Sequence, residues 1–397
     1  MKRKVPLRLA YFSPLPPARS GIADYTVDLL PHLSQLADVT LFTPDPEQVT
    51  AVWQPPCPIQ PATSYPAHRW QYDLTLYQMG NSDQHDWLYP YSLRYPGVLV
   101  LHDYTLHHAL AHRTKGQAAY VRELGYSYGL AGIRLAYQIQ AQEQPMPLFV
   151  VPLHERLLHT NLGFIVHSHY VARRIRPHTG QRPLAVVPQL MPPQTYDSGA
   201  RTSLPQWPTH WPADGIILAT AGYLTASRQL GQSLRAFKQL SERWPIYYLI
   251  IGDTGHEVDV MALITELGLT ERVHLAGYLP DLAQFSQWLA TADIILNLRF
   301  PTAGETSAIA LRAMAAGKAM MVYDHGWYHE LPDSVCYKVS VMDQSALQAG
   351  LASLIADPER RGQLGQAALA YVGQHCDPAQ VAQQYLDLCQ QVLVSQT

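Results

Sequence analysis

Two turns in the second half of the sequence combine glycine with hydroxyl and charged side chains. The first runs from Gly222 to Arg228 and includes Thr225; the second, from Gly304 to Ser307, reads Gly-Glu-Thr-Ser. If each turn joins a buried strand to a helix, backbone N–H groups and the positive end of the helix dipole lie beside it, and this arrangement binds phosphate. A guanidinium strengthens such a site. We therefore expect Gly222, Thr225 and Arg228 to bind a diphosphate, although an ordinary surface arginine would show the same local pattern.

The Gly-Glu-Thr-Ser turn could position a sugar as well as a phosphate. Glu305 can accept hydrogen bonds from sugar hydroxyls, and the N–H groups at 306–308 can face phosphate oxygens. Thr306 or Ser307 could instead cap the following helix, with Glu305 beside the helix dipole. We favour the functional interpretation, because capping alone does not explain the small residues of that helix, which ends at Gly317.

The first half offers a glycine turn and a histidine at expected strand ends. Gly21 opens a helix after a proline-rich turn, where its backbone could approach a phosphate or sugar oxygen; an ordinary strand-to-helix turn would also need it. His102 directly follows a buried strand, where a near-neutral imidazole suits proton transfer or hydrogen bonding to a sugar. His108 and His112 are spaced for one helix face, but no third ligand has a recognisable spacing, so we expect no metal site.

Short apolar runs alternate with helical patterns along the chain, which is typical of parallel α/β domains. The expected strands cover 7–12, 38–42, 73–77, 97–101, 163–167, 184–187, 215–220, 246–251, 272–275, 293–297 and 319–323. The expected helices lie near 24–36, 115–143, 228–243, 257–268, 281–291, 306–316, 344–356, 358–374 and 378–394.

Six prolines between Pro188 and Asp214 separate the two sets of elements. Proline removes backbone donors and restricts the residue before it, so this stretch should be irregular. We expect two doubly wound sheets facing a central cleft, where open α/β sheets bind ligands. The predicted parts are an N-terminal domain at 1–190 joined by the last helix at 378–397, a proline-rich linker at 191–214 and a C-terminal domain at 215–377.

The composition excludes several classes of protein. Of the 397 residues 47% are hydrophobic and 15% charged, which is too apolar for a disordered chain, and the net charge of −3 argues against a general nucleic-acid-binding surface. A dinucleotide fingerprint is absent, which disfavours a nicotinamide oxidoreductase. No run of 18 apolar residues predicts a membrane-spanning helix. Four cysteines without metal spacing and no signal-peptide pattern point to a cytoplasmic protein.

Together these turns resemble glycosyltransferase family 4, whose members have the GT-B fold of two Rossmann-like domains and transfer sugars with retention of configuration. The resemblance is strongest from 215 to 335. The family's Gly-x5-Lys loop is matched by Gly222 to Arg228, with arginine in place of lysine. The family's Glu-x7-Glu is followed by Ala-Met-Ala-x-Gly, and the second part is matched by the residues 313–317.

Two positions differ from that family pattern. The first glutamate is displaced by one, to Glu305, and the second, which in the family holds the nucleotide ribose, is Arg312. A subset of family-like sequences with Gly-Glu-Thr-Ser followed by an arginine is more similar to this chain. Such an arginine could contact a phosphate or pair with an acid such as Glu330, which follows Gly326 in a turn similar to the family's Gly-x(2–3)-Glu.

The resemblance implies a metal-independent enzyme that transfers a sugar from a nucleotide sugar, such as a UDP- or GDP-sugar, to an acceptor hydroxyl. It places the donor in the C-terminal domain and the acceptor in the N-terminal domain. The predicted catalytic residues are His102, Arg228 and Glu305. The predicted donor-binding residues are Gly21, Gly222, Thr225, Tyr278 (stacked on the nucleobase), Gly304, Thr306, Ser307, Arg312 and Glu330.

Two alternatives stay open, a nucleotide-sugar epimerase of the same fold and a non-catalytic nucleotide-sugar-binding subunit. The absence of a second clear acid disfavours the epimerase, while Arg312 keeps the binding subunit open. The acceptor could be a glycan, a lipid-linked molecule or a small molecule. The Tyr- and Leu-rich helix near 117–140 could line an acceptor groove or touch the inner face of a membrane, although an ordinary helix packed on the sheet explains it too.

Overall fold

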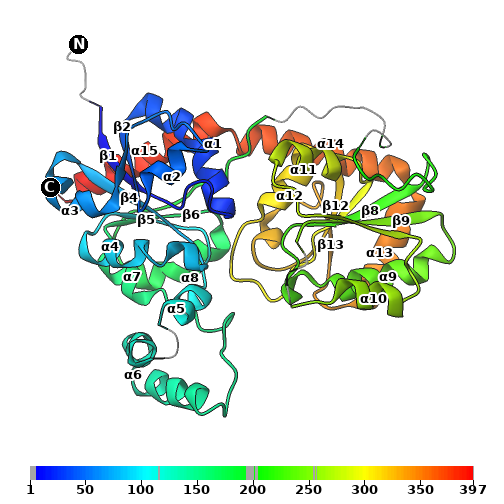
Figure 1. Ribbon diagram of the computed structural model, residues 1–397, viewed down its shortest axis with the longest axis horizontal. Helices are drawn as coiled ribbons and strands as arrows, with labels where there is room; N and C mark the ends of the chain where they lie inside the picture. The colour runs from blue at the N-terminus through cyan, green and yellow to red at the C-terminus, as the bar shows by residue number, and fades with distance from the viewer. Residues whose placement is uncertain are drawn as a thin grey trace. The chain divides into compact units, whose positions relative to one another are not determined.

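The computed structural model describes residues 6–114, 117–193, 201, 204–253, 255 and 257–396. The chain forms two compact units (Figure 1). The first unit contains residues 1–190, 303–306 and 377–397, and the second contains 191–302 and 307–376. The predicted proline-rich linker at 191–214 lies partly outside the described residues.

The first unit is built on a seven-stranded parallel sheet in the order β3-β2-β1-β4-β5-β6-β7. All six strands predicted in the first half of the sequence are present, because parallel strands covered on both faces appear as continuous apolar runs. Only the short edge strand β3 was not predicted. The strands are β1 (Arg8–Phe12), β2 (Asp38–Thr43), β3 (Ile59–Pro61), β4 (Leu74–Met79), β5 (Val98–Leu101), β6 (Gly163–Val166) and β7 (Leu184–Val186).

Helices cover both faces of this sheet, and two separate apolar clusters form its cores (Figure 1). The last helix, α15 (Pro378–Ser395), packs against α1 (Gly21–Leu36) and β6, and the hydroxyls of Tyr25 and Tyr385 join the two helices at 2.8 Å. The other helices are α2 (Pro46–Thr50), α3 (Tyr65–His68), α4 (Leu88–Arg94), α5 (His107–Thr114), α6 (Ala118–Gln140), α7 (Glu155–Thr160) and α8 (His169–Thr179).

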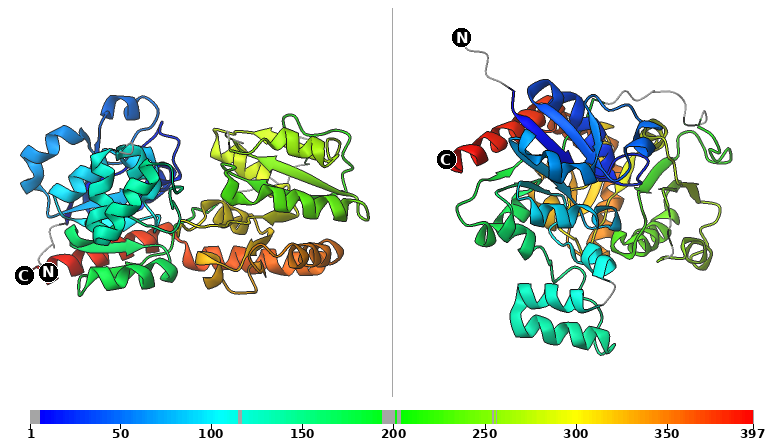
Figure 2. Two further views of the ribbon diagram at one scale, coloured as in Figure 1. Left: turned by 90° about the horizontal axis from the view of Figure 1, so that it is seen from below. Right: turned by 60° about the vertical axis from the view of Figure 1, so that its left-hand side comes forward.

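The predicted long helix at 115–143 is two helical segments. The backbone of Gly129 leaves the helical region with φ of 60° and ψ of −141°, a conformation that residues with a side chain avoid. Figures 1 and 2 show the two segments of α6 lying side by side and projecting from the rest of the unit. α6 packs on α5 and α7, and its buried residues Tyr120 and Leu124 belong to the apolar cluster that also includes residues of β5 and β6.

The second unit has a six-stranded parallel sheet in the order β10-β9-β8-β11-β12-β13. All five predicted strands are present, and the three-residue edge strand β13 was missed. The strands are β8 (Ile216–Ala221), β9 (Ile246–Ile251), β10 (Val273–Gly277), β11 (Ile294–Leu296), β12 (Ala319–Tyr323) and β13 (Tyr337–Val339). The helices are α9 (Leu230–Ser241), α10 (Val260–Glu266), α11 (Leu282–Ala290), α12 (Ala308–Ala315), α13 (Gln344–Ala356) and α14 (Pro358–His375), with 3₁₀ turns at η5 (Ala226–Arg228) and η6 (Gly326–Glu330).

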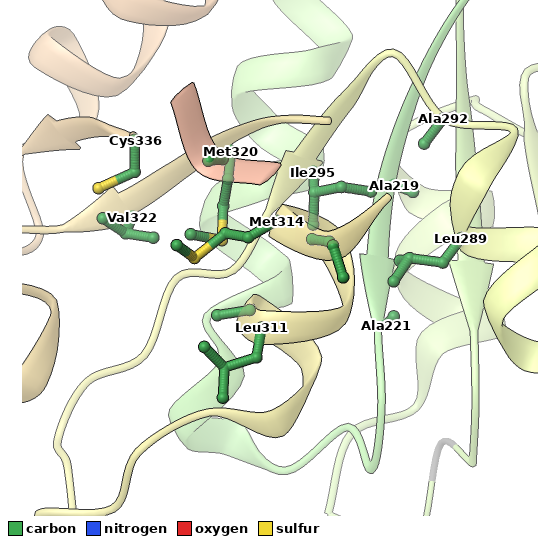
Figure 3. Close-up of a cluster of buried hydrophobic side chains, with 14 of the residues drawn as sticks. Ala219, Ala221, Leu289, Ala292, Ile295, Leu311, Met314, Met320, Val322 and Cys336 are labelled. Carbon is green, nitrogen blue, oxygen red and sulfur yellow. The ribbon is translucent and has the colours of Figure 1, made fainter. Parts of the chain in front are cut away.

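Helix α12 packs tightly into the core of the second unit. Leu311 and Met314 lie against Ile295, Met320 and the neighbouring strands (Figure 3). A Cβ atom on Gly365 of α14 would collide with the carbonyl oxygen that follows α12, at Gly317. Close packing therefore explains the small residues of α12, which the sequence interpretation had counted in favour of a ligand.

None of the helices in the described ranges is long and apolar enough to cross a membrane.

Candidate functional site

Three glycines lie at the ends of neighbouring strands, at the carboxyl edge of the second sheet. Gly222 and Gly252 directly follow β8 and β9, and Gly277 is the last residue of β10; their φ angles are 105°, 132° and 72°. A Cβ on Gly252 would collide with the carbonyl oxygen of Gly222, and Gly252 N donates to Gly277 O at 2.8 Å. Close approach of protein atoms therefore explains Gly222 and Gly252, whereas a Cβ on Gly277 would meet no atom within 4 Å. The carboxyl edge that they line is where open α/β sheets bind ligands. Gly252 was missed, although an Ile-Gly pair ending a buried strand is a usable signal.

Arg228 is held inside this edge. Its side chain is only 7% exposed, and its Nη1 donates to Asn297 Oδ1 at 2.8 Å. A Cβ on Gly222 would lie 3.0 Å from Arg228 Nη2, so the glycine lets the guanidinium lie close to the backbone. The alternative of an ordinary surface arginine is wrong. Thr225 shares a hydrogen bond of 2.9 Å with Ser227 and forms the outer part of the same turn.

The connection from β11 to α12 is fastened to the turn that carries Arg228. Phe300 N donates to Ser227 O at 2.8 Å, and Gln229 Nε2 donates to Phe300 O at 2.6 Å. With the bond from Arg228 to Asn297, these contacts join two segments separated by about 70 residues of sequence. Within the second unit, the structure thus places the first predicted turn beside the segment that leads into the second.

Asn297 links this pair of segments to two more groups. Its Nδ2 donates to Ser307 Oγ and to the hydroxyl of Tyr328, each at 3.0 Å. Ser307 Oγ also accepts from Ala310 N at 3.2 Å, so Ser307 is the N-cap of α12, as the capping alternative required. Sequence reasoning missed Asn297 as a site residue. Its signal was a polar side chain directly after the buried strand Asp-Ile-Ile-Leu.

Two aromatic rings are exposed at the same carboxyl edge. Tyr278 follows Gly277 and is 46% exposed, and Tyr223 follows Gly222 and is 57% exposed. Exposed tyrosine rings are of the type that can stack on a planar ligand. Nearby, Glu257 Oε2 accepts from Ala226 N at 2.9 Å, so a carboxylate holds one backbone donor of the Arg228 turn.

The Gly-Glu-Thr-Ser turn is divided between the two units. Residues 303–306 belong to the first unit, where Thr105 N donates to Ala303 O at 2.8 Å and Thr306 Oγ1 donates to Gln189 Oε1 at 3.0 Å. Gly304 has a φ of 84°, and a Cβ there would collide with Cβ of Tyr104. Thr306 therefore has a protein partner in the structure. Glu305 is half-buried and lies between Gly304 and Thr306 in the sequence.

His102 lies in a buried hydrogen-bonded group in the first unit. Its Nε2 lies 2.7 Å from Gln78 Oε1, and its Nδ1 lies 3.2 Å from His167 Nε2. Burial, with the neighbouring imidazoles of His167 and His85, lowers the pKa of His102 well below its usual value. Burial thus favours the neutral ring, and both nitrogens have protein partners, which differs from the expected imidazole directed at a ligand. A catalytic role for His102 stays a prediction.

The comparisons with known proteins fit this arrangement. Residues 206–370 match the family model described as "Glycosyl transferases group 1". The match covers less than half of the 397 residues and, apart from 303–306, lies within the second unit, so it is this part of the chain that resembles the family. No curated protein matches it.

Solved structures match this chain over nearly its whole length. Sucrose-phosphate synthase from Thermosynechococcus elongatus is 16% identical, with 98% of this chain and 100% of that chain covered and a TM-score of 0.69. Anabaena Alr3699/HepE, in a complex with UDP-glucose, is 16% identical, with 96% and 98% covered and a TM-score of 0.68. A glycosyltransferase from Rickettsia africae is 12% identical, with 98% and 99% covered and a TM-score of 0.67. At such identities the matches establish the fold, and the predicted GT-B architecture of two parallel α/β domains is confirmed.

Two further predicted site residues lie within the second unit. Arg312, on α12, is 7% exposed, and Glu330 is half-buried at the end of η6. Gly326 begins η6 with a φ of 63°, a conformation that favours glycine. Pairing of Arg312 with Glu330 or with a phosphate stays a prediction.

The histidines considered as metal ligands have other partners. His108 Nδ1 lies 3.0 Å from Asn81 Nδ2, and His112 Nδ1 lies 3.0 Å from Asp86 Oδ2. Over the ranges that the structure describes, no group of three or more His, Cys, Asp or Glu side chains is arranged to hold a metal ion.

Gly21 offers a direct test of ligand approach in the first unit. It begins α1 behind Ser20, whose Oγ accepts from Ile22 N at 3.2 Å, and an added Cβ would meet no atom within 4 Å. We expect Gly21→Ala to keep its Tm within about 2 °C, because nothing in the protein is displaced. If a substrate contacts the Gly21 backbone, kcat/KM falls at least about tenfold.

The matched control for this test is Gly373→Ala on the exposed side of α14, where an added Cβ also meets no atom within 4 Å. Unchanged turnover of Gly21→Ala, measured beside that control, would remove Gly21 from the site.

Proposed function

We propose that the chain transfers a sugar from a nucleoside-diphosphate sugar to an acceptor hydroxyl with retention of configuration. The observation that carries this proposal is the buried guanidinium of Arg228 at a glycine-lined sheet edge. A fixed cation at the carboxyl edge of a parallel sheet suits a diphosphate, because little reorganisation is needed when the ligand binds. The fold neighbour Alr3699/HepE, solved with UDP and with UDP-glucose, supports the same donor class.

The diphosphate is the leaving group in this proposal. The bond between the anomeric carbon and the phosphate oxygen breaks, and the acceptor oxygen bonds to the same face of that carbon. The acceptor proton passes to the departing phosphate. Negative charge grows on the phosphate during this step, so Arg228 and the N-terminus of α12 at Ser307 stabilise the transition state more than the ground state. Arginine and the helix dipole supply positive charge without a metal ion.

The remaining predicted residues have separate roles in the proposal. Tyr278 stacks on the nucleobase through its exposed ring. Glu305 accepts hydrogen bonds from the donor sugar, and Arg312 contacts a phosphate where family members hold the ribose. His102, held by Gln78 and His167, keeps its predicted catalytic role.

The acceptor side of the proposal belongs to the first unit. Leu130 and Tyr137, on the projecting α6, are 84% and 60% exposed, so this element presents apolar surface to its surroundings. Such a surface fits an acceptor with a lipid part at the inner face of a membrane, where tyrosine rings are favoured. With a glycan or small-molecule acceptor, by contrast, the exposed surface of α6 would contact water and not a membrane.

A thermal-shift panel of UDP-, GDP-, ADP- and dTDP-sugars, with the free diphosphates, tests the donor class. One nucleotide at 100 times its Kd should add about 2.7 kcal/mol to the free energy of unfolding and raise Tm by about 5–10 °C. If no member of the panel shifts Tm, the proposal fails at its first step.

Product analysis with the stabilising nucleotide sugar then separates the alternatives. Glycoside formation or release of the nucleoside diphosphate supports the transferase. A donor changed only in its sugar stereochemistry would identify an epimerase, and an unchanged donor would identify a binding subunit.

A further inference from the structure

Asn297 makes three hydrogen bonds to three different segments of the second unit. It directly follows β11 and is only 2% exposed. Its Oδ1 accepts from Arg228 Nη1 at 2.8 Å, and its Nδ2 donates to Ser307 Oγ and to Tyr328 OH, each at 3.0 Å. These partners lie in the Arg228 turn, at the N-terminus of α12 and in η6.

The chemistry of the partners fixes which way the amide faces. A guanidinium has only donors, so the group facing Arg228 must be the carbonyl oxygen. The two hydrogens of Nδ2 then point at the two hydroxyl oxygens, which accept them. Each polar atom of the buried amide has a partner, as burial of an amide requires.

This orientation also sets the direction of the Ser307 hydroxyl. Ser307 Oγ accepts from Asn297 Nδ2 and from Ala310 N, which uses both of its lone pairs. The hydroxyl can then form one more hydrogen bond, as a donor through its O–H. Within the described parts of the chain, this O–H has no acceptor. Ser307 is thus set to donate to an anion at the N-terminus of α12.

We infer that Asn297 is a positioning residue that fixes both Arg228 and the Ser307 hydroxyl as donors to the diphosphate of the sugar donor. This inference rests on the proposed function and adds a residue to it. Asn297 does not touch the ligand. Its carbonyl oxygen sets where the guanidinium of Arg228 lies. Its NH₂ group donates to Ser307 Oγ and so leaves the serine O–H as a donor to the ligand. An apolar residue after β11 would serve the core equally well but would do neither.

The test compares Asn297→Asp with Tyr328→Phe. A carboxylate in place of the amide still accepts from Arg228, but it adds a negative charge beside the ligand and draws the Ser307 proton to itself. Tyr328→Phe removes one bond of Asn297 and leaves its bonds to Arg228 and Ser307 intact. The probes are UDP and UMP, or the corresponding di- and monophosphate of whichever nucleoside stabilises the wild type.

We expect Asn297→Asp to lower the ratio of diphosphate to monophosphate affinity at least about tenfold, and Tyr328→Phe to change it less than about threefold. A purely structural defect would weaken both ligands together and leave the ratio unchanged. If the aspartate variant does not fold, Asn297→Thr carries the same test, because one hydroxyl cannot reach all three partners.

The outcomes are distinct. If the wild type binds no nucleoside diphosphate, the proposed function itself has failed. If the wild type binds and the Asn297 variant that folds keeps the wild-type ratio within about twofold, the inference is overturned while the proposed function stands.

Discussion

Arg228→Ala should bind its nucleoside diphosphate at least about 100-fold more weakly than the wild type. The guanidinium lies in a buried setting at the glycine-lined edge, where loss of one partner of a charged hydrogen-bonded pair costs about 3 kcal/mol. That free energy corresponds to the expected factor. Isothermal titration with the nucleotide selected by thermal shift measures it. Arg228→Lys keeps the charge but loses the planar fork, so we expect an intermediate loss of about tenfold.

Arg235→Ala is the matched control for this experiment. Arg235 lies on the exposed side of α9 in the same unit, so its loss changes the net charge equally without touching the sheet edge. Equal affinities of Arg228→Ala and Arg235→Ala for the nucleotide would exclude Arg228 from the donor site.

The first unit should lose several kcal/mol of stability as the pH falls from 6.5 to about 4. Burial lowers the pKa of His85, His107 and His167 from 6.5 to about 4 each. The unfolded chain binds protons at these rings below pH 6.5, whereas the folded unit does not until about pH 4. Stability is therefore fully present above pH 6.5 and is lost on acidification, by up to about 3 kcal/mol for each ring.

Chemical unfolding at several pH values, with hydrogen exchange of β4 to β6 to report on the first unit, measures this loss. His167→Asn should make the slope of unfolding free energy against pH shallower by about 1.4 kcal/mol per pH unit, because one proton fewer is taken up. Replacing the exposed His68 in the same way is the control. A free energy of unfolding that stays constant between pH 6.5 and 4.5 would contradict the prediction.

Local sequence patterns predicted most of the fold because both sheets are parallel and covered on two faces. Their strands then appear as short apolar runs, and only the three-residue edge strands β3 and β13 escaped. The break at Gly129 was missed because the apolar pattern continues through it. A glycine inside a helical pattern is compatible with a continuous helix and with a reversal, and packing on α5 and α7 decides between them.

The candidate site was less accessible to sequence reasoning. Gly222 and Arg228 lie within one turn, so spacing alone brought them together. Asn297 acquires its role only through partners 69, 10 and 31 residues away, which no local pattern reveals. The setting of His102 depends in the same way on Gln78 and His167, which come from neighbouring strands.

The position of α15 has a consequence for synthesis of the protein on the ribosome. This helix, at Pro378–Ser395, completes the unit that begins with β1, because it covers α1 and β6. The nascent chain therefore exposes those apolar surfaces until residues 378–395 have been translated. The second unit, which ends at Cys376, emerges complete before that moment. The first unit can therefore complete its core only after the second unit has been synthesised, whereas the N-terminal domain usually folds first during synthesis.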